Sequence, residues 1–308
     1  MQKIKIAISS FGNIGQAILN THLEHIAKFG STNDISLVGI IRRNASGKNS
    51  GVPKNVPVVS DIRALKTKPD VIICAGPSGH VKEDIKKFLR LGISTVDCYD
   101  SHPNILKYRN DLGKIAVKNK AVSVLSTGWD PGFDSIQRAL FMQLSPLGET
   151  LTTFGPGRSM GHTTEVKDIS GVKNAVSLTL PGSKPGTQKR KVYVVAEASQ
   201  QKRIKKEIIN HPYFIKDPTV VQFVPSIAKY DTDKHQGHLL NCGKKVKVDI
   251  TLSGVNPVMT ANMMYAAARA AFRACADKRF GCFTVVEFAP LDFIQGKTAK
   301  ERLLRIKY

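Results

Sequence analysis

Acidic residues and the only tryptophan of the chain lie in two short segments that could carry chemistry. Asp97 and Asp100 follow an apolar run, and Trp129 and Asp130 lie within residues 126–132, Ser-Thr-Gly-Trp-Asp-Pro-Gly. Carboxylates beside an amine hold it as a cation or accept its proton, depending on their pKa values. We therefore take Asp100 and Asp130 as candidate catalytic residues and Trp129 as a pocket wall. A turn aspartate and an ordinary core tryptophan remain the alternatives at this point.

Basic residues and histidines form a second group further along the chain. Arg190, between two lysines, borders an apolar run and could bind a carboxylate through two hydrogen bonds. On the residues alone, a solvated basic face is the favoured interpretation. His235 and His238 lie in a segment that reads as a loop, and with no obvious third ligand we predict hydrogen-bonding histidines and no metal. The sequence contains no nucleophile-elbow pattern, so hydrolysis through a covalent intermediate is not indicated.

The element expected to position these groups begins the chain. Residues 4–8 form a run that is apolar except for Lys5, residues 9–15 form a small-residue turn, and a helical pattern of apolar residues follows. Strand, tight turn and helix open a dinucleotide-binding fold. Gly12 would let the backbone approach a pyrophosphate at the helix N-terminus, and Gly15 would let helix and strand pack closely. Ser10 stands where the first glycine of this motif is usual.

The end of the next apolar run, residues 35–41, indicates which nucleotide is bound. Arg42 and Arg43 follow it, where an NAD site would favour an acidic residue for the ribose 2′-hydroxyl. Arginines offer charge-assisted hydrogen bonds to a 2′-phosphate instead. We therefore predict NADP, with two solvated arginines as the alternative. The predicted cofactor contacts are Ser10, Gly12, Asn13, Ile14, Arg42, Arg43, Gly76 and Pro77.

Short apolar strands alternate with helical patterns as far as residue 125, which predicts a parallel sheet. Ligands gather beyond the carboxyl ends of such strands. Five polar or glycine-rich segments should therefore meet at one edge of the sheet: residues 10–15, 42–43, 76–79, 97–100 and 128–130. Residues 44–57, rich in Gly, Ser, Asn, Pro and Lys, read as a flexible surface loop.

The pattern changes after residue 125 and predicts a second domain. A glycine-rich loop at 155–162 and several strand-like runs surround one helix, roughly residues 200–210. Pro257 then opens a long alanine-rich helix, and a last strand at 282–287 should pack back on the first domain. We predict an α/β protein with two parts. Residues 1–127 and 257–308 form a Rossmann-type NADP-binding domain, and residues 128–256 form an α+β substrate-binding and dimerisation domain with a mostly antiparallel sheet.

Composition limits the class of protein and its compartment. The 308 residues are 42% apolar and include five scattered cysteines, which suits a protein with reduced thiols in the cytoplasm. We expect no signal peptide and no membrane span. The net charge of +22 is attributed first to a lysine-rich surface and in part to anionic ligands. Nucleic-acid binding is the less favoured interpretation, because no basic tail or basic-aromatic interleaving is present.

Taken together, the motifs resemble the meso-diaminopimelate D-dehydrogenase family. The resemblance rests on residues 126–132 and on 155–162, which read Gly-Pro-Gly-x-Ser-x-Gly-His, and continues in order over nearly the whole chain. It implies NADP-dependent oxidative deamination of the D-centre of meso-2,6-diaminopimelate to L-2-amino-6-oxopimelate, ammonia and NADPH. Run in reverse, this reaction serves the synthesis of lysine and peptidoglycan precursors. The resemblance further implies a homodimer with a split nucleotide-binding domain.

The resemblance also implies roles for individual residues. Asp100 and Asp130 would surround the reacting amino group, with Trp129 beside it. Met160 and Gly161 would lie in a loop that borders the reacting carboxylate. The residues expected to hold or contact the distal L end of the substrate are Thr179, Arg190, His235 and Asn256.

Three residues depart from the family pattern. Asn104 stands where an aspartate is often found, Phe154 replaces a tryptophan of the substrate site, and Ser10 replaces a glycine. The loop at 181–189 is also shorter than in many members. Two alternatives therefore stay open: a related NADP-dependent D-amino acid or imine oxidoreductase with relaxed substrate choice, and a non-catalytic NADP-binding protein.

Overall fold

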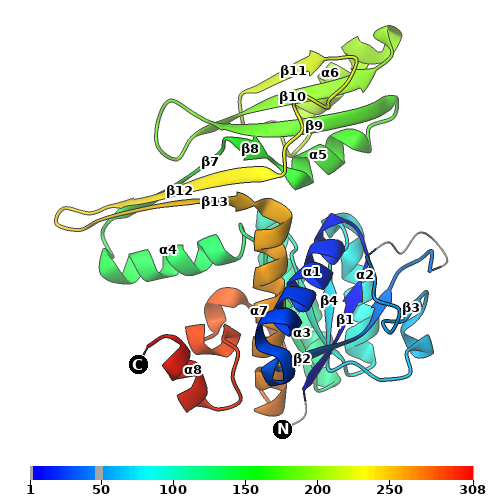
Figure 1. Ribbon diagram of the computed structural model, residues 1–308. Coiled ribbons are helices and arrows are strands. Elements are labelled where there is room, and N and C mark those ends of the chain that lie inside the picture. The colour runs from blue at the N-terminus through cyan, green and yellow to red at the C-terminus, as the bar shows by residue number, and fades with distance from the viewer. Residues whose placement is uncertain (1–2, 46–50, 308) are drawn as a thin grey trace. The chain divides into compact units, whose positions relative to one another are not determined.

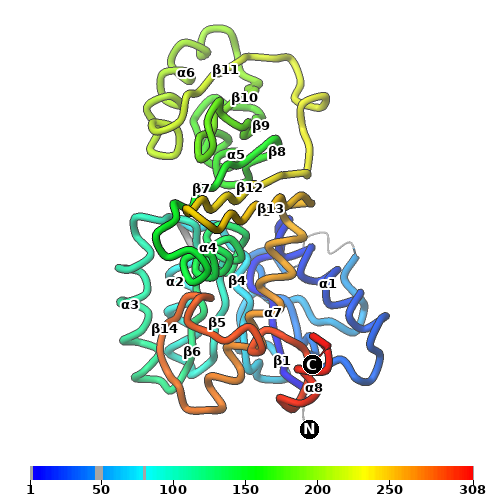
Figure 2. The backbone as a smooth tube through the Cα atoms, turned by 90° about the vertical axis from the view of Figure 1, so that its left-hand side faces the viewer, coloured from blue at the N-terminus to red at the C-terminus, as the bar shows by residue number. Residues whose placement is uncertain are grey.

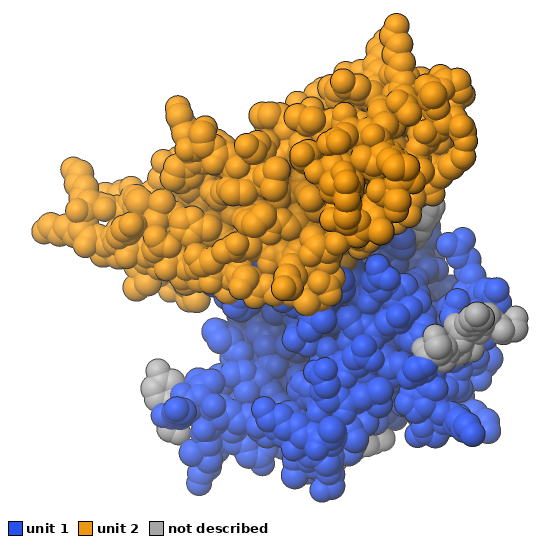
Figure 3. Space-filling view, turned by 45° about the horizontal axis from the view of Figure 1, so that its top comes forward, with its two compact units in different colours: residues 1–137, 257–308 blue, residues 138–256 orange. Residues whose placement is uncertain are grey.

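The computed structural model describes residues 3–45 and 51–307 and divides into two compact units (Figures 1 and 3). Unit 1 comprises Met1–Gln137 and Pro257–Tyr308, and unit 2 comprises Arg138–Asn256. The predicted boundary at 127/128 precedes helix α4 (Phe133–Leu144), whereas the contacts divide the chain inside that helix. No helix among the described residues is long and apolar enough to cross a membrane.

Unit 1 is built on one seven-stranded sheet in the order β14-β6-β5-β4-β1-β2-β3, in which every pair of neighbours is parallel. This confirms the predicted Rossmann-type sheet and its completion by the C-terminal segment. The strands are β1 (Ile4–Ser9), β2 (Ile35–Ile41), β3 (Val58–Val59), β4 (Val71–Cys74), β5 (Ser94–Asp97), β6 (Val122–Leu125) and β14 (Gly281–Thr284). The last strand is shorter than predicted because residues 285–287 form a 3₁₀ turn.

Helices cover both faces of this sheet, α2 and α3 on one face and α1 and α7 on the other (Figure 2). Successive strand residues point to opposite faces, so Ile6 and Ile8 pack with α1 and α7, and Ala7 packs with α2 and α3. The helices of unit 1 are α1 (Asn13–Phe29), α2 (Ser78–Arg90), α3 (Ile105–Lys118), α7 (Asn256–Ala276) and α8 (Ala299–Arg305). The predicted loop 44–57 lies between β2 and β3, and its residues 46–50 fall outside the described part of the chain.

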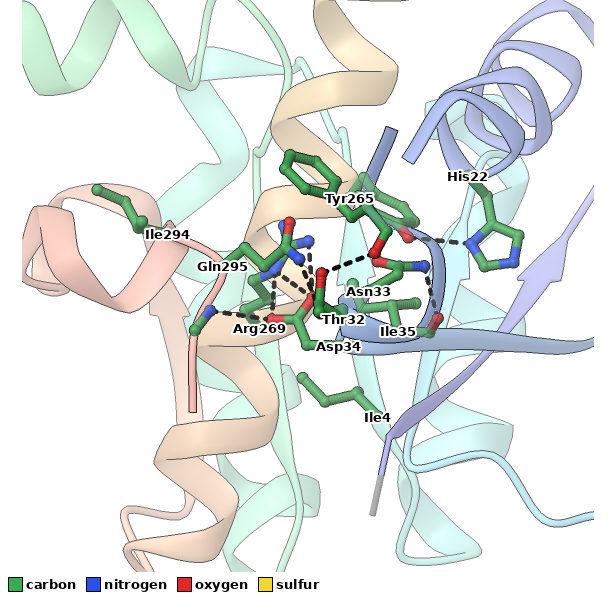
Figure 4. A network of polar contacts seen from close by, with 12 residues as sticks. Ile4, His22, Thr32, Asn33, Asp34, Ile35, Tyr265, Arg269, Ile294 and Gln295 are labelled. Atoms are coloured by element: carbon green, nitrogen blue, oxygen red, sulfur yellow. Dashed lines mark hydrogen bonds and ion pairs between the residues drawn. The ribbon is translucent and has the colours of Figure 1, made fainter. Parts of the chain in front are cut away.

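A buried polar network fastens the C-terminal return to the start of β2 (Figure 4). The guanidinium of Arg269 on α7 donates to both carboxylate oxygens of Asp34, at 2.9–3.1 Å. Arg269 is only 3% exposed, so this ion pair is removed from solvent and depends on its two-pronged geometry. Nearby, Gln295 donates to the carbonyl of Thr32 at 3.0 Å. These contacts join segments that lie more than two hundred residues apart in the chain.

Unit 2 contains two sheets, where the sequence predicted one. The first has the order β11-β10-β9-β8 and the second β13-β12-β7. Most pairs are antiparallel, as predicted, but β10 and β11 are parallel because helix α6 crosses over between them. The strands are β7 (Glu149–Phe154), β8 (Gly157–Arg158), β9 (Val172–Pro181), β10 (Gln188–Ala196), β11 (Thr219–Phe223), β12 (Lys234–Cys242) and β13 (Lys247–Val255). The helices are α4, α5 (Met160–Lys167) and α6 (Gln201–Asn210).

Two predicted loops of unit 2 are in fact regular structure. The segment around His235 and His238 is strand β12, and Met160 and Gly161 lie in the first turn of α5. Strand β12 escaped prediction because its inward positions alternate His, Gly, Leu and Asn, which breaks the apolar alternation expected of a strand. Helix α5 has only eight residues, too few for a clear helical period.

Candidate active site

The turn after β1 has the geometry of a phosphate site. Ser10 adopts a φ of 72°, the left-handed conformation that a glycine takes without steric cost. A Cβ atom on Gly15 would lie 2.4 Å from the Ser10 carbonyl oxygen, so helix and turn meet too closely for any other residue. A Cβ atom on Gly12 would meet nothing within 4 Å, and no side chain caps α1 there. An anion therefore has open access to the helix N-terminus, which fits the predicted pyrophosphate.

Backbone contacts tie the neighbouring strand tips to this turn. The Ser10 N–H donates to the Ile41 carbonyl at 2.9 Å, and the Ala75 N–H donates to the Ser9 carbonyl at 2.8 Å. Arg42 and Arg43 directly follow β2, and Gly76 and Pro77 lie between β4 and α2, so three adjacent tips carry all eight predicted cofactor residues. The described residues of these tips therefore fit a dinucleotide, and Arg42 and Arg43 remain the predicted contacts to a 2′-phosphate.

The tips of β5 and β6 carry the predicted catalytic residues on adjacent strands. Asp100 follows β5, and its carboxylate accepts a hydrogen bond from the Ser78 hydroxyl at 2.7 Å. Asp130 follows β6 and lies 3.8 Å from the Nε2 atom of His102. Trp129 directly precedes Asp130 and is 4% exposed, so its indole is buried. Sequence reasoning named neither Ser78 nor His102, although Ser78 lies within one of the predicted polar tips.

Glycines close the loop that presents Trp129 and Asp130. Gly128 and Gly132 form a bridge, and a Cβ atom on Gly132 would lie 2.0 Å from the Gly128 carbonyl oxygen. The N–H of Asp134 donates to the Trp129 carbonyl at 2.9 Å and ties the loop to α4. These backbone contacts thus hold the loop that carries the two residues in a defined conformation.

A buried arginine is the centre of a second group, in unit 2. Arg190 on β10 is 7% exposed and lies directly opposite Thr179 of β9, to whose hydroxyl it donates. Its Nε donates to Asp217 at 2.7 Å. Burial lowers the pKa of the Arg190 guanidinium, and Asp217 opposes that effect. The predicted Arg190 and Thr179 are therefore brought together, whereas Asp217 had no sequence signal.

His235 at the start of β12 lies beside this arginine group. Burial and the charge of Arg190 lower the pKa of His235 to about 4, so its imidazole is neutral at neutral pH. The ring stacks against Phe154 at a centroid distance of 5.9 Å. Gly157 is required here, because a Cβ atom would lie 2.5 Å from the His235 Cα. Four predicted substrate residues thus meet in one place: Phe154, Thr179, Arg190 and His235.

The remaining predicted substrate residues lie at helix starts. Met160 and Gly161 begin α5, where Ser159 contacts the Nδ1 of His162 at 2.8 Å and the Nε2 of His162 contacts the Tyr213 carbonyl at 2.7 Å. Burial lowers the pKa of His162 to about 3, so a neutral histidine fixes this turn. Asn256 begins α7, and its N–H donates to the Asp233 carbonyl at 3.2 Å.

His238, which the sequence offered as one of a possible metal pair, lies on strand β12. No group of three or more His, Cys, Asp or Glu side chains is placed to hold an ion in the part of the chain that the structure describes. His238 instead contacts the Asp249 carboxylate at 2.6 Å on the neighbouring strand β13.

Comparison with known proteins assigns the family. A model of the diaminopimelic acid dehydrogenase C-terminal domain matches residues 128–254. The meso-diaminopimelate D-dehydrogenase of Bacteroides fragilis is 34% identical over 96% of this chain and 97% of its own length. The enzyme of the same name from Corynebacterium glutamicum is 32% identical over 94% of this chain and 95% of its own length.

Solved structures agree with the sequence comparison. The C. glutamicum DAP dehydrogenase in complex with DAP has a TM-score of 0.86 at 30% identity and covers 100% of both chains. An engineered D-amino acid dehydrogenase bound to NADP+ has a TM-score of 0.84 at 29% identity and covers 99% of both chains. Similarity in sequence over almost the full length, together with this shared architecture, shows that the chain belongs to the meso-diaminopimelate D-dehydrogenase family.

Proposed function

We propose that this chain catalyses the NADP-dependent oxidative deamination of the D-centre of meso-2,6-diaminopimelate, with L-2-amino-6-oxopimelate, ammonia and NADPH as products. Membership of the family makes the chain an oxidoreductase that uses NADP. The observation that carries the assignment of the site is the pair of carboxylates, Asp100 and Asp130, on neighbouring tips of a dinucleotide-type sheet.

The carboxylates of unit 1 act on the reacting amino group. When bound, NADP+ accepts the hydride that leaves the D-centre. Asp100 and Asp130 hold the amino group as an ammonium ion and take up the proton that it releases as the carbon–nitrogen double bond forms. Water then adds to this imine, and ammonia leaves. Trp129 shields the carboxylates from bulk water, which strengthens their interaction with a cation.

The group in unit 2 binds the distal L end of the substrate. Arg190 offers a charged, directional donor to a carboxylate, and Thr179 and Asp217 fix the plane of its guanidinium. Neutral His235 adds a hydrogen-bond partner without a second charge. Met160, Gly161 and Asn256 complete the substrate contacts. A charged hydrogen bond contributes about 1.5–3 kcal/mol, so anchoring this end supports discrimination between stereoisomers.

A spectrophotometric assay tests the reaction directly. Purified protein with NADP+ at alkaline pH should form NADPH with the meso isomer and none with the L,L isomer. Replacing NADP+ by NAD+ should lower kcat/KM. Absence of any absorbance change with the meso isomer would contradict the proposed reaction, and equal rates with both isomers would contradict the proposed anchoring.

A relaxed substrate range is the second candidate, and Asn104 is the observation that favours it. Its side-chain amide donates to the Ser101 hydroxyl at 2.9 Å in an exposed turn, where family members often carry an aspartate. With one carboxylate fewer, the site would select less strongly for substrates that carry an amino group at that position. A panel of D-amino acids in the same assay separates the candidates, because a strict enzyme turns over the meso isomer alone.

Assembly, compartment and partners are also part of the proposal. We propose a homodimer, supported by the exposed apolar side chains Leu140, Met142, Leu144 and Leu147 of unit 2. Five free cysteines support a reducing, cytoplasmic compartment. Nucleic acid is not proposed as a partner. Light scattering of the wild-type protein should give twice the mass of one chain. The double variant Leu140→Glu, Met142→Glu should give the mass of a single chain.

A further inference from the structure

We propose that Asp97, a buried carboxylate at the end of β5, is a positioning residue that fixes the two loops carrying Asp100 and Asp130. It acts with Tyr99, Ser126 and Thr127, and we call these four residues the β5–β6 clamp. The inference rests on the proposed function, because Asp100 and Asp130 receive their roles there.

The clamp joins the two loops immediately before their functional residues. The Asp97 carboxylate accepts hydrogen bonds from the N–H of Tyr99 at 2.9 Å and the N–H of Ser126 at 3.3 Å. Tyr99 directly precedes Asp100. One carboxylate therefore sets the path of both chains as they leave the sheet.

Three further hydrogen bonds complete the clamp. The Asp97 carbonyl accepts from the N–H and from the hydroxyl of Thr127, both at 2.8 Å. The Ser126 hydroxyl donates to the Tyr99 carbonyl at 2.8 Å. Ser126 has a φ of 56°, an uncommon conformation for serine that needs support from its surroundings. The clamp holds it, and residues 127–130 continue from there.

A carboxylate at this buried position lowers the stability of the folded protein. Asp97 is 0% exposed, and within the described residues no lysine or arginine is among the groups that act on its carboxyl. Burial raises the pKa of Asp97 to about 7, although its hydrogen bonds oppose the rise. A buried charged group without a counter-ion costs stability. What the carboxylate provides in return is a single side chain that accepts hydrogen bonds from two loops at once.

Thr127 and Thr95 offer a matched pair of variants. Both are fully buried and both donate a hydroxyl hydrogen bond between β5 and β6. The Thr95 bond, to Ser123 at 2.9 Å, lies inside the sheet, whereas the Thr127 bond lies in the clamp. Thr127→Val should lower kcat with meso-diaminopimelate on the order of tenfold through misplacement of the loops. Thr95→Val should leave kcat within about twofold, although the melting temperature should fall similarly in both.

Asp97 itself is tested by removal and by conservative replacement. Asp97→Ala should lower kcat on the order of a hundredfold while the Kd for NADP+ stays unchanged, because the nucleotide tips lie on other strands. Asp97→Asn keeps a side-chain oxygen that accepts both N–H groups and should recover at least about tenfold of that loss.

The outcomes separate this inference from the proposed function. An inactive wild-type protein contradicts the proposed function. An active wild type in which Thr127→Val and Thr95→Val change kcat equally contradicts the clamp. A folded Asp97→Ala protein that binds NADP+ and keeps its kcat also contradicts it. If Asp97→Ala fails to fold, the threonine pair decides.

Discussion

The tips of β5 and β6 in unit 1 and the strands β9, β10 and β12 in unit 2 build their functional groups in different ways. In unit 1 the carboxylates stand on loops that backbone hydrogen bonds and glycines hold in place. In unit 2 Arg190 and Thr179 stand inside strands, as direct cross-strand neighbours, and His235 begins a third strand. Loops allow fine placement around a reacting atom, and strands provide a rigid anchor. Unit 1 should therefore govern turnover and unit 2 affinity.

Loss of a unit 1 carboxylate should have the largest effect. Asp130→Asn should lower kcat on the order of a thousandfold with little change in KM, because the amide cannot take up the proton of the amino group. Steady-state kinetics with the meso isomer measures both constants. Asp111→Asn, at a partly exposed aspartate of α3 that pairs with Lys82, is the control and should retain normal kinetics. An Asp130→Asn enzyme with a raised KM and an unchanged kcat would contradict the assignment of turnover to unit 1 and affinity to unit 2.

Loss of the unit 2 anchor should come next. Arg190→Ala should lower kcat/KM on the order of a hundredfold, mainly through KM, because the distal carboxylate loses its charged hydrogen bonds. The Kd for NADP+ should not change. Its exposed neighbour supplies a control, Lys189→Ala, which should behave as wild type. If both variants weaken the enzyme equally, general positive charge rather than a specific anchor is responsible.

The cofactor tip of unit 1 should show a smaller and selective effect. Arg42→Asp should weaken NADP+ binding about tenfold and leave NAD+ binding nearly unchanged, because only the former carries a 2′-phosphate. Fluorescence titration with both nucleotides measures the ratio. Equal loss for both nucleotides would remove the argument for a phosphate contact at Arg42.

The two regions should also differ in how acid affects stability. Burial lowers the pKa of His162 in unit 2 from its ordinary value of 6.5 to about 3. Between these two pH values the unfolded chain therefore binds more protons than the folded chain. Stability is therefore lost as the pH falls through 6.5 toward 3, by about 1 kcal/mol between pH 7 and 5.5. Asp97 has a raised pKa and contributes the opposite sign, losing stability as the pH rises from 3.8 through about 7.

Denaturant unfolding at several pH values tests this contrast. His162→Gln should flatten the loss of unfolding free energy on acidification, and Asp97→Asn should flatten the loss on alkalisation. A His162→Gln protein with the wild-type pH dependence would show that this histidine is not neutral in the folded state.

Sequence patterns predicted unit 1 more fully than unit 2, for a physical reason. The turn from Ser10 to Gly15 is a local structure, and parallel topology alone brings the strand tips together. The group in unit 2 depends on which residues face each other across strands. Arg190 could be named from the residues, but only the family resemblance favoured a binding role over a solvated basic face. Thr179 could be named only from the resemblance, and Asp217 had no signal at all. The Asp97 and Ser78 contacts likewise join residues more than twenty positions apart, which no local pattern encodes.

The late position of β14 in the chain has a consequence for synthesis on the ribosome. Every strand of unit 2 emerges before α7, whereas β6 has no neighbour on its outer side until residues 281–284 are made. During synthesis, all of unit 2 is therefore made while the sheet of unit 1 is still incomplete. The unpaired edge of β6 is then a site for unwanted strand pairing. Arg269 lies on α7, so its ion pair with Asp34 also forms only after unit 2 has been made, and translation pauses before α7 should increase aggregation of the nascent protein.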